Sequence, residues 1–151
     1  MKKLIIIGIL LTIPFLSLGA DVFTAETAHY RILSTQSTQS AQDLGLRMES
    51  YYRLFNEVFR FIDSELPVKM NVRLFTSKND FDTYLLRIVP QTRESFVYIQ
   101  YKDPEKCELV LFLEQENISE EMLIHHGFIQ YLNSFIPHPP LWMLKGFAKY
   151  F

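Results

Sequence analysis

The sequence has one cysteine, few glycines and no excess of basic side chains, and each shortage narrows the class of protein. Cys107 has no second cysteine to pair with, so an internal disulfide is excluded. Five glycines and an aromatic content of 15% favour a packed core over a disordered chain. Acidic residues outnumber basic ones, 17 to 15, which argues against binding to nucleic acid or to an anionic membrane.

The one long apolar run lies at the N-terminus. Two lysines precede an almost wholly apolar stretch from residue 4 to residue 18, and small residues follow. This pattern predicts a secretory signal peptide over residues 1–20, cleaved after Gly19 or Ala20. The run is shorter than the about 20 residues of a membrane span, and no cysteine follows it to carry a lipid. We therefore expect an exported protein, periplasmic or extracellular, with an uncleaved N-terminal anchor as the alternative.

Residues 21–151 have the pattern of one domain that alternates strands and helices. Apolar side chains recur with a 3.6-residue period from residue 40 to 62, which predicts a long helix. Alternation from residue 68 to 75 predicts a strand with one buried face. The complete predicted order is a strand at 29–33, the helix at 40–62, the strand at 68–75, a helix from Ser77 or Asn79 to 87, a hairpin of strands 95–101 and 108–113, a helix capped by Asn117 or Ser119, and a last helix after Pro140. This order predicts an α+β fold in which helices pack on a small mixed sheet.

Two helical segments near the C-terminus carry the most specific motif. The first reads Leu-Ile-His-His-Gly-Phe-Ile around His125, the second reads Trp-Met-Leu-Lys-Gly-Phe-Ala around Lys145, and a proline-rich loop lies between them. The pair resembles the active-site helices of gluzincin-type, peptidase MA-like metallopeptidases, in which H-E-x-x-H is followed by roughly W-L-x-E-G-L-A-x-Y. The resemblance implies that His125 stands at the first zinc ligand, His126 at the general base, Ile129 at the second ligand and Lys145 at the third.

Three of these four positions have lost the chemistry of the family. Two histidines four residues apart can hold one metal ion from a single helix face, and a neighbouring carboxylate can polarise the metal-bound water. Ile129 has no donor atom, and Lys145 is normally an ammonium ion that repels a divalent cation. We therefore predict no catalytic residue, no metal and no cofactor.

A shift of register by one residue gives a second candidate metal pair, His126 and Gln130. Its carboxylate position is then Gly127, which has no side chain, and the shift breaks the match to Trp142. His125 and His126 point about 100° apart on a helix, so they are poor partners for one ion. The structural alternative is one partly buried histidine bonded to a backbone carbonyl and one surface histidine.

Other side chains of this region also have two interpretations. Lys145 either binds a carboxylate, such as a peptide terminus, in the former metal cleft, or is a solvated helix residue. Trp142 either lines a ligand groove beside Tyr131 or anchors the packing of its helix. His138 lies in the loop between the helices and is a candidate neighbour of His125, although the spacing does not require this.

The leading hypothesis is a secreted or periplasmic pseudopeptidase-like protein with a binding or structural role, whose partner is a protein or a peptide. One alternative is an active zinc metallopeptidase with atypical ligands. The other is a non-functional, truncated remnant, since the sequence stops within an apolar-faced helix that usually leads into further helices in this family. Zinc content separates the enzyme from the other two, and cooperative unfolding separates the binding protein from the remnant.

Overall fold

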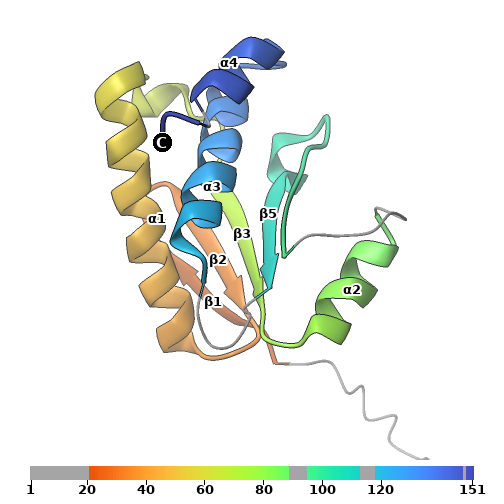
Figure 1. Ribbon diagram of the computed structural model, residues 1–151. Helices are drawn as coiled ribbons and strands as arrows, with labels where there is room; N and C mark the ends of the chain where they lie inside the picture. The colour runs from red at the N-terminus through yellow and green to blue at the C-terminus, as the bar shows by residue number, and fades with distance from the viewer. Residues whose placement is uncertain (1–20, 89–94, 113–117, 148) are drawn as a thin grey trace, which may run out of the picture.

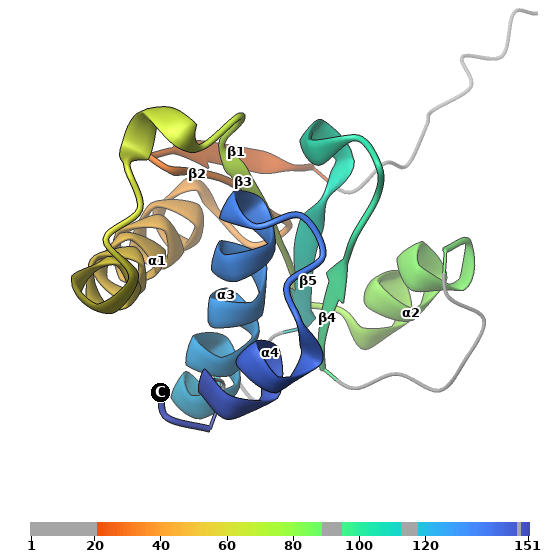
Figure 2. The same ribbon diagram turned by 90° about the horizontal axis from the view of Figure 1, so that it is seen from above.

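A five-stranded mixed sheet with helices on both faces forms the centre of the protein (Figures 1 and 2). The computed structural model describes residues 21–88, 95–112, 118–147 and 149–151, so the predicted signal peptide and Asn117 lie outside the described residues. The elements are β1 (Phe23–Glu26), β2 (Tyr30–Ser34), α1 (Thr38–Phe59), η1 (Asp63–Glu65), β3 (Met70–Phe75), α2 (Lys78–Leu86), β4 (Phe96–Ile99), η2 (Pro104–Lys106), β5 (Glu108–Phe112), α3 (Glu120–Phe135) and α4 (Leu141–Phe147). The predicted α+β fold with a small mixed sheet is confirmed.

The strands lie in the order β1-β2-β3-β5-β4. The three central strands run parallel, whereas β1 and β4 pair antiparallel at the two edges. The predicted hairpin is confirmed, since Phe96 of β4 lies opposite Leu111 of β5. The edge strand β1 was not predicted from the sequence. In both views α1 and α3 lie on one face of the sheet and α2 on the other (Figures 1 and 2).

The long helix α1 begins and ends with clear capping groups. The Ser37 hydroxyl accepts a hydrogen bond from the Ser40 N–H at 3.0 Å, which satisfies one of the free donors of the first turn. Arg60 has a left-handed backbone (φ 54°) and stops the helix at Phe59, three residues before the predicted end. Ile62, the last residue of the predicted helix, therefore lies outside α1 and is 62% exposed.

The main core lies between the sheet and the pair α1 and α3. Phe55 of α1 meets Phe128 and Tyr131 of α3 with ring centroids 5.4 Å away in each case. Gly127 lies where the two helices approach, because a Cβ atom at this position would lie 3.3 Å from the Cε atom of Met48. The apolar residues whose spacing predicted α1 thus form the helix face that contacts α3.

The central strand β3 is buried on both faces, so the prediction of a half-buried strand is wrong. Asn71 is only 8% exposed, and its side-chain amide donates to the carbonyls of Glu105 and Cys107 at 2.9 and 3.1 Å. The Arg73 side chain bonds to the buried Glu108 carboxylate at 3.1 Å. These polar residues alternate in the sequence as solvent-facing residues do, but here partners from β5 and the turn before it satisfy them.

Helix α2 covers the other face with a smaller cluster. Ser77 caps it, as predicted, by accepting a hydrogen bond from the Asp80 N–H at 3.3 Å. Phe81 and Leu85 are fully buried, whereas Ile88 is only partly buried. None of the helices in the described part of the chain is long and apolar enough to cross a membrane.

Candidate functional site

Helices α3 and α4 form the predicted helix pair. Ser119 caps α3 by accepting a hydrogen bond from the Met122 N–H at 3.4 Å, and two glutamates follow in the first turn, where the helix dipole favours them. Helix α3 ends at Phe135, before the prolines, and α4 begins at Leu141. His125, His126 and Ile129 therefore lie on α3 and Lys145 on α4, as the motif implies.

The two histidines pack as aromatic side chains. The His126 ring stacks on Phe96 of β4 with a centroid distance of 5.7 Å and an interplanar angle of 13°. The His125 ring meets His126 edge-on at 5.1 Å. Burial, together with the neighbouring His125, lowers the pKa of His126 to about 4, so its imidazole is neutral at pH 7. Both histidines are half-buried, so the expectation of one surface histidine is wrong.

The other two positions of the motif cannot supply a zinc ligand. Ile129 is half-buried and has no donor atom, and Lys145 is exposed. None of the ion pairs among the described residues involves Lys145, in agreement with a solvated helix residue. Across the described ranges no three His, Cys, Asp or Glu side chains converge as a metal site. The residues at this helix pair do not fit a zinc ion.

The shifted pair of His126 and Gln130 is divided between two different environments. Gln130 is 1% exposed, and its side-chain N–H donates to the Asn71 carbonyl at 2.8 Å. His126 packs instead on Phe96. Each side chain of this pair therefore has its own contact in the fold.

The interpretation of Trp142 as a packing anchor is wrong, because this residue is 68% exposed. Tyr131, its expected neighbour in a groove, is fully buried. The Tyr131 hydroxyl donates to the Asn56 side chain at 2.7 Å. Phe147 anchors α4 instead, with its ring 4.9 Å from that of Phe59.

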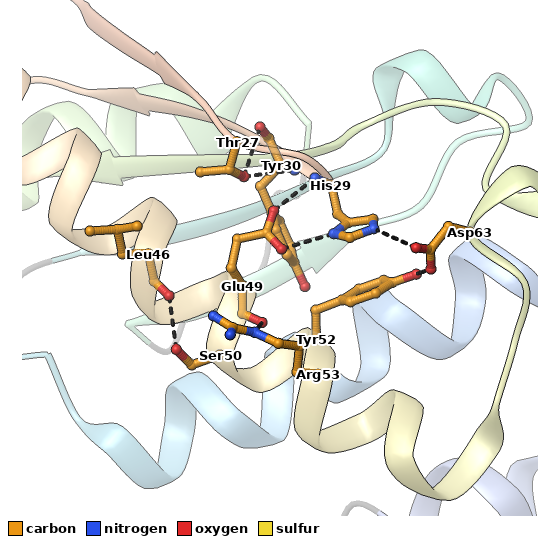
Figure 3. Close-up of polar contacts among 9 residues, drawn as sticks. All are labelled: Thr27, His29, Tyr30, Leu46, Glu49, Ser50, Tyr52, Arg53 and Asp63. Carbon is orange, nitrogen blue, oxygen red and sulfur yellow. Dashed lines mark hydrogen bonds and ion pairs between the residues drawn. The ribbon is translucent and has the colours of Figure 1, made fainter.

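A histidine with two carboxylates, which the sequence analysis did not single out, lies where β2 begins (Figure 3). The His29 ring nitrogen Nδ1 lies 2.8 Å from Glu49 of α1, and Nε2 lies 3.5 Å from Asp63 of η1. The His29 backbone N–H also donates to Glu49 at 2.7 Å, and the ring stacks on Tyr52 at 3.7 Å. Because both ring nitrogens face a carboxylate, the cluster ties three segments together rather than presenting a free base.

The carboxylates of this cluster have perturbed acidity. Burial raises the pKa of Glu49, but hydrogen bonds from His29 and Thr27 outweigh burial, and the net pKa is lowered. The hydrogen bond from the Tyr52 hydroxyl lowers the pKa of Asp63, with a smaller contribution from His29. Both carboxylates are therefore held in the ionised form by the folded structure. Their sequence separation from His29 leaves no local signal of the cluster.

No protein-family model matches the chain, and no curated protein matches its sequence. The specific part of the resemblance to peptidase MA-like enzymes lies in the residues of α3 and α4.

The structure also contains a cavity of about 580 Å³ at the C-terminal end of α3. Its wall includes Gln130 of α3, His138 of the inter-helix loop, and the cysteine before β5. The Cys107 sulfur lies 3.2 Å from the Tyr101 backbone nitrogen and 3.3 Å from the carbonyl oxygen of the same residue, so the thiol is held within its own turn. None of the four motif positions lines this cavity.

Proposed function

We propose that the chain is an exported, pseudopeptidase-like binding domain. It keeps the helix pair of a zinc peptidase as a packed structural unit but lacks two zinc ligands and the general base. One observation carries the proposal: Phe128 and Phe147 hold α3 and α4 in the main core, with ring centroids 6.3 Å from each other, while Ile129 and Lys145 offer no donor to a metal ion.

The residues at the motif favour binding over hydrolysis. His126 is neutral at pH 7, but its ring lies against Phe96, and no carboxylate stands at the position of the general base. The partner in this proposal is a protein or a peptide, and its site need not coincide with the former zinc position. Export belongs to the same proposal, and N-terminal sequencing of the exported protein tests it. A chain that retains Met1 would contradict cleavage and favour an anchor.

Zinc titration of the wild type and of the triple variant His126→Glu/Ile129→His/Lys145→Glu tests the relationship to zinc peptidases. The variant restores the ligands and the base, so we expect it to gain a zinc site that the wild type lacks. The matched control carries His126→Glu, Ile129→Ala and Lys145→Glu, which gives the same formal charge without the second histidine. We expect weak binding by this control.

Thermal unfolding accompanies the titration, because His126→Glu places a carboxylate against Phe96 in a half-buried position. The double variant Ile129→His/Lys145→Glu avoids this cost and still completes three ligands. Equal, weak zinc binding by all variants and the wild type contradicts the register and the family relationship. One zinc ion per wild-type chain indicates the active enzyme with atypical ligands, and a wild type without cooperative unfolding indicates the remnant.

A further inference from the structure

The cavity beside the C-terminal end of α3 has the size of a small-molecule or side-chain pocket. Its volume of about 580 Å³ lies within the range typical of ligand sites. The start of β3, the end of β4, the turn before β5 and the last turns of α3 surround it. These segments meet at the end of the sheet that lies uppermost in Figure 1. Met70, Tyr98 and Pro137 give it apolar walls.

The charged side chains that line the described part of the pocket are both cationic. Lys69 and Lys102 line it, and the described part of the lining has no aspartate or glutamate, although the chain as a whole is acidic. Lys69 is paired with Glu26 at 2.9 Å. None of the ion pairs among the described residues involves Lys102, which is exposed. Its ammonium group therefore suits an anion at the mouth of the pocket.

Gln130 lines the pocket, and its side-chain amide has a buried acceptor that the described residues leave unsatisfied. Its Nε2 donates to the Asn71 carbonyl at 2.8 Å, and because a carbonyl only accepts, this bond fixes the orientation of the amide. The Oε1 atom is buried and has no hydrogen-bond partner among the residues that the structure describes. A buried acceptor without a partner costs free energy, so a ligand that donates an N–H to Gln130 gains by satisfying it.

We propose that this pocket binds the C-terminal residue of a peptide that ends in an apolar side chain. Such a residue carries all three complementary groups: a carboxylate for Lys102, an amide N–H for Gln130, and a side chain for the wall of Met70 and Tyr98. A free carboxylic acid without an amide satisfies the cation but not the acceptor. The inference rests on the binding role proposed above and gives that role a ligand and a site.

Calorimetric titration of the purified protein with acetyl-Gly-Ser-Gly-Phe tests the proposal. Two related probes are the C-terminal amide of this peptide, which removes the anion, and a peptide methylated on its last amide nitrogen, which removes the donor. We expect each to bind at least about tenfold more weakly than the parent peptide. Equal affinity for the free acid and the amide overturns the proposal, as does the absence of binding by the parent peptide at about 1 mM.

Variants of the protein then locate the site. Lys102→Gln is expected to weaken binding of the free acid at least about fivefold and to leave binding of the amide unchanged. Lys149→Gln is the matched control, because Lys149 is exposed and does not line the pocket. Equal weakening by the two substitutions would show a diffuse electrostatic effect and overturn the assignment to this pocket.

Acetyl-phenylalanine tests whether the ligand is a peptide or a free N-acylated amino acid, because both carry the same carboxylate, amide N–H and side chain. If this small molecule binds as tightly as the tetrapeptide, the pocket takes an N-acylated amino acid and the peptide ligand is wrong. We expect it to bind more weakly, because Gln100, Asn133 and Ser134 also line the pocket and offer hydrogen-bonding groups to the additional peptide bonds of the longer probe. The zinc titration does not involve this pocket, so failure here and failure of the proposed relationship to zinc peptidases are distinguishable.

Discussion

The α1–α3 face of the sheet and the α2 face differ in how much apolar side chain covers them. The cluster under α1 and α3 contains buried residues of four strands, β2, β3, β4 and β5, and of both helices. The cluster under α2 has a short set of buried members: Phe75, Phe81, Leu85, Ile99 and Val110. The helix pair that resembles a peptidase site lies on the more extensively covered face.

This difference in burial affects the free energy of global unfolding and that of local opening differently. Free energy gained by burial grows with the apolar area removed from water, so the α1–α3 cluster dominates the global free energy of unfolding. Helix α2 has fewer buried contacts, so it opens at a lower free-energy cost while the remainder stays folded. The three motif positions on α3 therefore lie on the part of the molecule with the larger core.

Removal of one aromatic ring from each cluster is the strongest test of this comparison. We expect Phe128→Ala to lower the free energy of unfolding by about 4–5 kcal/mol and Phe81→Ala by about 3 kcal/mol, since both rings are fully buried. The larger loss follows from the rings of Phe55, Phe59 and Phe147 around Phe128. Urea denaturation measures both values. An equal or larger loss for Phe81→Ala would show that the α2 cluster is as important to global stability.

We expect acid to lower the free energy of unfolding by protonating the two carboxylates of the cluster of His29, Glu49 and Asp63. The folded structure lowers the pKa of both carboxylates, so their contribution is complete above about pH 4.5 and is lost as the pH falls through the lowered values. Glu49→Gln should cost about 2 kcal/mol at pH 7 and flatten the loss of stability between about pH 5 and pH 3.

The control for this substitution is Glu57→Gln, an exposed change on the same helix. Urea denaturation across the pH range provides the measurement for both variants. If the two substitutions give the same pH profile, the His29 cluster does not set the acid sensitivity of the protein.

Removal of the helix caps is expected to change the free energy of unfolding least. It also distinguishes local opening of α2 from unfolding of the whole protein. Ser37→Ala and Ser77→Ala should each cost about 1 kcal/mol for their own helix. In native-state hydrogen exchange we expect Ser77→Ala to speed exchange within α2 alone, whereas Ser37→Ala speeds the slowest amides throughout the main core. Exchange that changes in the same amides for both variants would refute independent opening of α2.

The parts of the fold that follow from a local pattern were predictable. The period of Leu44, Met48 and Phe55 predicted α1 because helix geometry places these residues on one face. The starts of α2 and α3 were predicted to within two residues, because Ser77 or Asn79 and Asn117 or Ser119 could each supply the missing acceptor, and Ser77 and Ser119 are the caps in the structure. The order of elements then sufficed for the α+β class.

The parts that depend on distant partners were not predictable. Burial of Asn71 and Arg73 depends on β5 and its preceding turn, and no local pattern reveals that pairing. The His29 cluster needs Glu49 and Asp63 from two later segments. At the candidate site, the sequence placed the motif residues on the correct helices, but the contact between His126 and Phe96 arises only when β4 joins the sheet.

The polar residues of β3 also matter while the chain is being made. On one side β3 pairs with β5, which follows it by more than thirty residues, so this side has no partner until Glu108–Phe112 has been synthesised. An apolar strand with an open edge is prone to aggregate with other chains. Asn71 and Arg73 interrupt the apolar run, and polar or charged residues within such a run lower its tendency to aggregate. The side chains that make β3 look half-exposed in the sequence are thus also the ones expected to keep the incomplete chain apart from others.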